Sequence, residues 1–159
     1  MICCLAIFAS LLFEYYYPIR PEYPKIFRAK SGAVKTIEEL RQLEKPDDKL
    51  KMYNLHEVSK HSGLKGTAAA WVVCKGVIYD VSSNNVYKSD GGYNCFAGKD
   101  ATIALGKMSF EKVGERGWQS KLSHDELAVV DEWVKWYEQR YKKVGYLTED
   151  YAGYDKKEQ

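Results

Sequence analysis

Residues 87–101 read YKSDGGYNCFAGKDA and gather the side chains of this chain with the most distinctive chemistry. The stretch holds two tyrosines, a glycine pair and a cysteine, and it contains no histidine. A phenol has a pKa of about 10, so its oxygen becomes a strong ligand only where a large positive charge stabilises the phenolate. Two interpretations follow from these residues. Either Gly91-Gly92 is a simple turn and Tyr93 a core tyrosine at a helix start, or Tyr93 presents its oxygen to a bound group.

The three histidines of the chain are His56, His61 and His124. The first two fall on a short predicted helix over residues 55–61, and the third opens the last predicted helix. We therefore expect surface or capping roles for all three. No nucleophile stands beside a base, and no pair of carboxylates is spaced for acid–base work, so the chain is not expected to be an independent enzyme.

Composition narrows the class of protein further. A length of 159 residues suffices for one domain with appendages, and a net charge of +2 gives no reason to expect a nucleic-acid partner. The thirteen tyrosines suit interfaces, membrane belts or a half-buried cofactor pocket. The four cysteines form no C-x-x-C pair and have no histidine at zinc-like spacing, so structural zinc is not expected. We expect two buried thiols in a reducing compartment, Cys74 and Cys95, and two apolar membrane residues, Cys3 and Cys4.

The first 17 residues are predicted to form a membrane anchor. Residues 2–13 carry no charge, and Tyr15, Tyr16 and Tyr17 extend this run into an interfacial aromatic belt. Twelve helical residues span about 18 Å against roughly 30 Å of hydrocarbon, so the anchor is either a short single pass or an interfacial segment. A cleaved signal peptide fits less well because the basic n-region and the cleavage site are missing. The basic residues of 18–35 predict a soluble part on the cytosolic or matrix side. A chain truncated at its N-terminus is a further alternative.

The soluble part divides into a connector, a domain and a tail. The connector covers residues 18–51 and contains a short amphipathic helix that Thr36 and Glu39 open as a capping box. The domain spans residues 52–147. It begins with a helix capped by Asn54 and continues with a hairpin of strands 69–74 and 77–81, joined by a turn at Lys75-Gly76. A polar tail follows over residues 148–159.

The second half of the domain is predicted to be mainly helical. A short helix covers residues 100–105, and a glycine-rich surface loop follows over residues 106–117. The longest helix covers residues 123–143, opens at a Ser123 cap and ends at a glycine signal, Val144-Gly145. Its apolar positions recur every three or four residues and form one face: Leu127, Val130, Val134, Tyr137 and Tyr141.

The order of motifs over residues 52–105 resembles the cytochrome b5-like fold. The resemblance rests on the Trp71-Val72-Val73 strand, the segment GVIYDV over 76–81, and the glycine pair followed by AGKDA over 97–101. It implies an α+β fold in which a small mixed sheet floors a haem cleft walled by short helices. Cytochrome b5 itself holds haem through two histidines, one of them in an H-P-G-G motif. This chain has SDGG there and no histidine at either position, which disfavours bis-histidine electron transfer.

Over residues 52–147 the chain is similar to the membrane-associated progesterone receptor family, including an extra loop at 106–122. That resemblance implies five-coordinate ferric haem b ligated by a tyrosine. Such ligation is chemically coherent, because the oxygen of a phenolate is a hard anionic donor that suits ferric iron. Matched position by position, it places Tyr93 as the iron ligand, with Tyr87 and Tyr141 as supporting pocket tyrosines. Arg140 stands where members often have lysine and would pair with a haem propionate. Val86, Lys88 and Ser89 depart from the usual F-Y-G-P pattern, whereas Tyr87 matches it. Met108 is an alternative ligand, although a thioether without a histidine partner is unusual.

The resemblance favours a membrane-anchored haem-binding protein that acts as an adaptor or haem carrier for membrane haem enzymes, such as cytochromes P450. The alternative is a cytochrome b5-like domain without haem, serving as an accessory subunit of a membrane complex. A redox partner is disfavoured by the missing histidines. We expect the endoplasmic reticulum membrane, with a mitochondrial membrane as the alternative. Haem content distinguishes the first two hypotheses.

Overall fold

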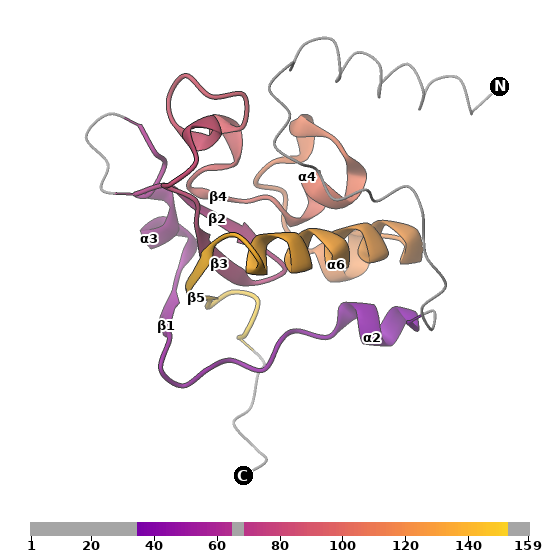
Figure 1. Cartoon of the computed structure of the whole chain (residues 1–159). Helices are drawn as coiled ribbons and strands as arrows, with labels where there is room; N and C mark the ends of the chain where they lie inside the picture. The colour runs from indigo at the N-terminus through magenta and orange to yellow at the C-terminus, as the bar shows by residue number, and fades with distance from the viewer. Residues whose placement is uncertain (1–34, 65–68, 153–159) are drawn as a thin grey trace, which may run out of the picture.

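A computed structural model describes residues 35–64 and 69–152 and contains a five-stranded mixed sheet (Figure 1). The strand order is β1-β5-β3-β2-β4. Their bounds are Lys51–Tyr53 for β1, Trp71–Cys74 for β2, Val77–Asp80 for β3, Lys99–Asp100 for β4 and Lys142–Leu147 for β5. Two neighbouring pairs are parallel, β1 with β5 and β2 with β4, and the others are antiparallel. The expected α+β architecture with a mixed sheet is thereby confirmed.

Helices and single turns surround this sheet. The α-helices are α2 (Ile37–Arg41), α3 (Leu55–Ser59), α4 (Thr102–Lys107), α5 (Trp118–Lys121) and α6 (His124–Glu138). Three 3₁₀ turns join them: η1 (Asn85–Tyr87), η2 (Asn94–Phe96) and η3 (Phe110–Lys112). The capping boxes predicted at Thr36, Asn54 and Ser123 are all present, because local side-chain-to-backbone bonds form wherever the spacing allows.

The predicted hairpin is confirmed at β2 and β3, which pair from Trp71 with Asp80 to Cys74 with Val77. Its two-residue turn places Lys75 at φ 52° and Gly76 at φ 77°. Positive φ at both central residues is the geometry whose twist matches two antiparallel strands. Strand β3 is covered on both faces: Tyr79 belongs to the larger core cluster, and Ile78 to the smaller one on the opposite face.

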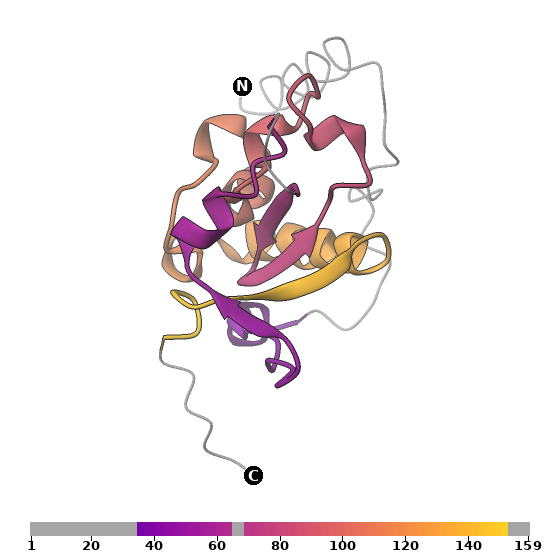
Figure 2. The ribbon, with the colours of Figure 1, turned by 90° about the vertical axis from the view of Figure 1, so that its left-hand side faces the viewer.

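The prediction for the last helix was wrong at its C-terminal end. Helix α6 ends at Glu138, and residues 142–147, which contain the expected glycine stop, form strand β5. Gly145 is needed for strand pairing, since a Cβ there would lie 2.1 Å from the carbonyl oxygen of Lys51 in β1. Strands β1 and β5 run side by side in Figure 2. The chain leaves the helix because a parallel partner contributed by residues 51–53 is available.

The segment after α4 was predicted to be a surface loop and is more ordered than that. The predicted loop, residues 106–117, contains the end of α4 and the turn η3, and helix α5 with its fully buried Trp118 follows directly. Gly106 also lies inside, where a Cβ would meet side-chain carbons of Leu122 and Val130 at 3.0 Å. The glycine there permits α4 to pack closely against α6.

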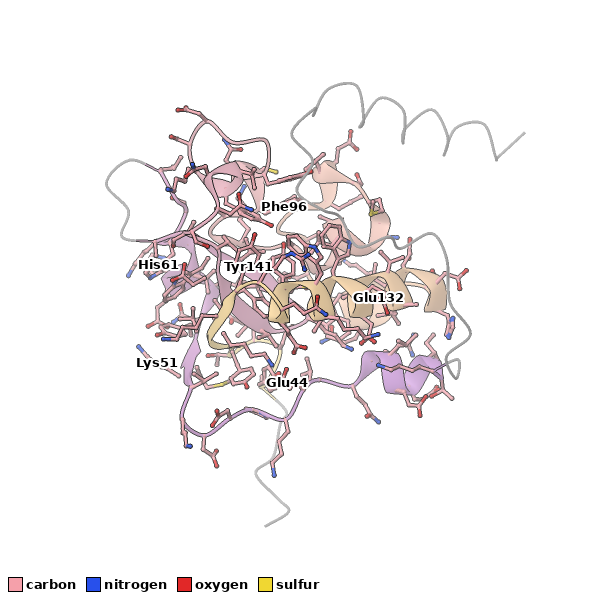
Figure 3. All side chains as sticks on the ribbon, viewed as in Figure 1. Glu44, Lys51, His61, Phe96, Glu132 and Tyr141 are labelled. Carbon is pink, nitrogen blue, oxygen red and sulfur yellow. The ribbon has the colours of Figure 1, made fainter. Side chains whose placement is uncertain are left out.

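The described part of the connector packs against the domain. Helix α2 lies beside α6 (Figure 1), and its Leu40 is 2% exposed. Glu44, labelled in Figure 3, accepts from Lys143 Nζ at 2.7 Å through its carboxylate and from Tyr151 Oη at 3.0 Å through its carbonyl. Lys35 reaches Asp131 of α6 at 2.6 Å. Residues on both sides of the predicted domain are therefore part of its packing.

No helix within residues 35–64 and 69–152 has the length and apolarity required to cross a bilayer. The predicted anchor over residues 1–17 lies outside the described residues.

Candidate functional site

The glycine pair allows two tyrosines to lie together. A Cβ on Gly91 would stand 2.1 Å from the carbonyl oxygen of Val86, so the backbone at 86 passes directly over that glycine. The same carbonyl accepts the N–H of Tyr93 at 2.9 Å and closes the loop. Tyr87 at the end of η1 and Tyr93 before η2 consequently have ring centroids 6.0 Å apart, and both rings are buried.

Tyr93 is one ring of an aromatic cluster. Its ring stacks on Phe96 at 5.8 Å and 11°, and on Phe110 at 6.0 Å and 27°. Phe96, labelled in Figure 3, belongs to the larger core cluster. Phe110 was not assigned from the sequence, because it lies in η3 within the segment interpreted as a surface loop. Only the folding of that segment brings Phe110 against Tyr93.

The end of α6 supplies the other side of the cluster. The hydroxyl of Tyr87 lies 3.3 Å from that of Tyr137, and the ring of Tyr87 meets Tyr141 edge-on at 6.1 Å. Asn84 donates its Nδ2 to the Tyr141 hydroxyl at 2.9 Å. The structure thus brings the rings of Tyr87, Tyr93 and Tyr141 into one cluster. The sequence did not identify Asn84 as a residue of this cluster. It assigned Tyr137 only to the apolar face of the helix, because the sequence contains no signal for the partner of its hydroxyl.

Arg140 lies at the edge of this cluster. Its guanidinium carbon is 4.6 Å from the centroid of the Trp136 ring, which contacts Tyr141 at 5.7 Å. Arg140 also donates to the Trp136 carbonyl at 3.5 Å, while the residue as a whole is exposed. A delocalised cation over an indole ring, at the exposed edge of the cluster, can meet an anionic group.

Burial keeps the inner phenols neutral. It raises the pKa of Tyr137 well above its ordinary value, and the neighbouring Tyr87 adds to the effect. Burial likewise raises the pKa of Tyr79, whose ring stacks on Tyr137 at 5.1 Å. A buried phenol without a neighbouring cation stays protonated and acts as a hydrogen-bond donor. A phenolate forms in such a cluster only where a strong positive centre is bound.

The histidines lie elsewhere. His124 opens α6 with its Nε2 2.8 Å from the Lys35 carbonyl, and this bond raises its pKa. His61 follows α3 and stacks on Trp71 at 3.4 Å, so it is a partly buried aromatic contact and not the surface or capping residue that was expected. Its position among apolar groups lowers its pKa. Within the described residues, no three His, Cys, Asp or Glu side chains gather as a metal site.

The sulfur-bearing residues Met108, Cys74 and Cys95 differ in their burial. Met108 ends α4 in a left-handed conformation, φ 51°, and is 52% exposed. Cys74 is buried as expected, whereas Cys95 is only partly buried against the core. Burial raises the pKa of the Cys95 thiol.

Residues 97–101, the AGKDA segment, connect the start of α4 to neighbouring segments. Asp100 accepts from the backbone N–H and the hydroxyl of Thr102 at 2.9 and 2.6 Å, which holds the start of α4. Arg116 donates to the other oxygen of Asp100 at 2.6 Å. Gly98 adopts φ +77° and donates its N–H to the Trp71 carbonyl. These contacts connect β4, α4 and the segment after α4, so Asp100 has a structural role.

A small mixed sheet carrying short helices, with an aromatic cluster of phenols between its loops and α6, defines a class of small-ligand binding domain. The chain belongs to the family described as Cytochrome b5-like Heme/Steroid binding domain, whose pattern matches residues 54–148. This confirms the resemblance inferred from the sequence.

Similar proteins point the same way. Membrane steroid-binding protein 2 of Arabidopsis thaliana is 39% identical over 90 residues, which cover 56% of this chain and 39% of that protein. Human neuferricin is 32% identical over 100 residues, covering 62% of this chain and 38% of neuferricin. The match therefore spans less than half of these two relatives. A solved Arabidopsis thaliana structure, described as having a cytochrome b5-like fold, superposes with a TM-score of 0.56 at 31% identity, covering 64% of this chain and 94% of that one.

The side chains of the cluster fit a haem group of one particular kind. The rings of Tyr93, Phe96 and Phe110 stack within 27° of parallel and give the apolar aromatic surroundings that suit a macrocycle. The polar groups around them are phenols and one amide. None of the three histidines, all in the described part of the chain, belongs to the cluster. Single phenolate ligation of ferric iron fits this donor set, and bis-histidine ligation does not.

Proposed function

We propose that this chain binds ferric haem b through the phenolate oxygen of Tyr93. The observation that carries the proposal is the position of Tyr93: it is buried against two parallel aromatic rings and lies beside a second phenol, Tyr87. Haem supplies a ferric centre whose positive charge stabilises the phenolate that burial otherwise disfavours.

The surrounding side chains have distinct roles in this proposal. Phe96 and Phe110 exclude water from one side of the ligand ring. Tyr141, fixed by the amide of Asn84, closes the side formed by α6. Arg140, held on Trp136, offers its guanidinium to a propionate. Anionic ligation by one phenolate favours ferric over ferrous iron, which suits binding, carriage or sensing better than rapid electron transfer.

We propose further that the protein is an adaptor or haem carrier, not an enzyme. No nucleophile–base pair was found in the sequence, and the cluster consists of aromatic rings and neutral donors. The relatives named as membrane proteins support a membrane location, for which the apolar residues 1–17 would supply the anchor. The expected partner is a membrane protein, either a haem enzyme or a larger complex, in the endoplasmic reticulum or a mitochondrial membrane.

A hemin titration of the full-length chain tests the haem proposal. The full length is needed because Leu40 and Tyr151, outside the predicted domain of residues 52–147, are buried in its core. We expect saturation at one equivalent and a high-spin ferric spectrum that is lost in Tyr93→Phe. The matched control is Tyr53→Phe, which removes a hydroxyl in the smaller core cluster on the other face of the sheet. If the wild-type protein does not saturate, the accessory subunit without haem becomes the better description.

A further inference from the structure

We propose that Tyr137 is a positioning residue for the iron ligand and acts through Tyr87. In this arrangement the Tyr137 hydroxyl donates to the Tyr87 hydroxyl, and Tyr87 in turn donates to the phenolate of Tyr93. The inference rests on the haem role proposed above. It starts from one contact, the 3.3 Å between the hydroxyl oxygens of Tyr87 and Tyr137 in the buried interior.

Tyr137 is held more firmly than a surface side chain would be. It stands in the last turn of α6, where its carbonyl accepts the N–H groups of Arg140 and Tyr141 at 3.0 and 2.8 Å. Its ring stacks on Tyr79 of β3 at 5.1 Å and meets Trp136 edge-on at 5.3 Å. The side chain is 1% exposed. Both the backbone and the ring therefore fix the direction of its hydroxyl.

A phenolate at Tyr93 sets the direction of these hydrogen bonds, since either hydroxyl of the Tyr87–Tyr137 pair can be the donor. Each phenol has one proton to donate and lone pairs to accept. Within residues 35–64 and 69–152, Tyr87 is the hydrogen-bond partner of the Tyr137 hydroxyl. When Tyr137 donates to Tyr87, the proton of Tyr87 is left for another acceptor. An anionic phenolate on the adjacent ring of Tyr93, 6.0 Å away between centroids, is the strongest acceptor that the proposed site creates.

Such a chain has a measurable electronic consequence. A hydrogen bond to an ionised acceptor is roughly twice as strong as a neutral one, and successive bonds strengthen one another by about 10–30%. Donation to the Tyr93 phenolate withdraws electron density from the ligand oxygen. Removing the Tyr137 hydroxyl weakens that donation and makes the phenolate a stronger donor to ferric iron. Its charge-transfer band then moves to longer wavelength, and the ferric form gains stability relative to the ferrous form.

The test compares Tyr137→Phe, Tyr87→Phe and the double variant, each as the full-length chain loaded with hemin, with Tyr53→Phe as the control. In Tyr137→Phe we expect a red-shifted phenolate-to-iron band and a ferric-to-ferrous ratio about 1.3- to 4-fold higher at a fixed applied potential, the effect of weakening one charge-assisted hydrogen bond by about 10–30%. In the Tyr87→Phe background the same change should add nothing. An equal shift in both backgrounds, or no shift while Tyr87→Phe does shift the band, overturns the inference.

A second substitution covers the case in which Tyr137→Phe folds poorly. Incorporating 3-fluorotyrosine at position 137 keeps the ring and makes its hydroxyl a stronger donor, so the band should move to shorter wavelength. A shift to longer wavelength, or none, contradicts the inference. Failure of the haem role gives a different pattern: hemin does not saturate, or Tyr93→Phe keeps the wild-type spectrum, and both proposals then fall. Loss of the spectrum in Tyr93→Phe without any effect at position 137 overturns only the role of Tyr137.

Discussion

The carboxylate of Asp150 lies 2.8 Å from the guanidinium of Arg116, and the same guanidinium reaches Asp100 at 2.6 Å. Two carboxylates, whose side chains are 3% and 0% exposed, therefore share one cation. This group connects the last described turn of the chain to the segment after α4 and to strand β4. Three segments of the chain meet at one partly buried arginine.

This shared cation predicts a specific pH dependence of folding. Burial and the nearby Asp100 raise the pKa of Asp150 to about 6, against the opposing pull of Arg116 and Gln119. The folded protein thus binds the Asp150 proton more tightly than the unfolded chain does. The resulting stabilisation is present below the unfolded pKa and is lost as the pH rises through about 6. We expect on the order of 1 kcal/mol of stabilisation from this group between pH 7 and pH 5.

Urea unfolding at pH 7, 6 and 5 measures this contribution as the difference between the wild type and Asp150→Asn. The comparison is needed because other groups titrate in the same window. The pKa of His61 is lowered, so His61 contributes a loss of stability as the pH falls, whereas the raised pKa of His124 contributes a gain. Exposed Asp48→Asn is the control and should keep the wild-type slope. If the unfolding free energy of Asp150→Asn changes with pH as much as that of the wild type, Asp150 is not the source of this pH dependence.

Gly91→Ala should damage the site more than the overall fold. The added Cβ meets the backbone of Val86, which cannot yield as a side chain would, so the loop must open and Tyr93 must move relative to Tyr87. We expect a cost of about 1–3 kcal/mol in unfolding free energy and loss of saturable hemin binding. Gly114→Ala is the control. A Cβ there meets nothing nearer than 3.9 Å, and the cost comes from its φ of +80°, about 1–2 kcal/mol. Hemin binding retained in Gly91→Ala would show that the loop closure is dispensable.

Asn84 has two roles that can be separated. Its side-chain oxygen accepts the Val86 N–H at 3.1 Å and caps η1, and its nitrogen donates to the Tyr141 hydroxyl at 2.9 Å. Tyr141→Phe removes only the second bond and should cost about 0.5–1.5 kcal/mol. Asn84→Ala removes both, so it should cost about 1 kcal/mol more. Thermal and urea unfolding of the two single variants and the double variant give the coupling free energy between Asn84 and Tyr141. Additive effects would contradict a direct bond between the two side chains.

Leu40→Ala should destabilise the domain although residue 40 precedes the matched family region. Leu40 is 2% exposed in the larger core cluster, and a buried leucine truncated to alanine costs about 2–5 kcal/mol. Leu64→Ala is the control, since Leu64 is 53% exposed and its truncation should change stability by less than about 0.5 kcal/mol. Urea midpoints measure both. Equal midpoints for Leu40→Ala and the wild type would mean that the connector is not part of the folding unit.

The sequence by itself determined the features that depend on neighbours a few residues apart. The capping boxes at Thr36, Asn54 and Ser123 and the turn at Lys75-Gly76 follow from local spacing, and each is present. The resemblance then identified Tyr87, Tyr93 and Tyr141, because the family pattern records positions that meet in space.

Tertiary structure decided the features that depend on distant partners. Residues 142–147 form a strand and not a helical turn because β1 and β3 lie on either side of them. Phe110 joins the cluster only after the segment following α4 has folded. The hydroxyl of Tyr137 finds its hydrogen-bond partner in Tyr87, fifty positions away in the sequence. Helix periodicity assigns a tyrosine to a face, but the partner of its hydroxyl depends on how α6 docks against the loop, and that docking is set by long-range packing.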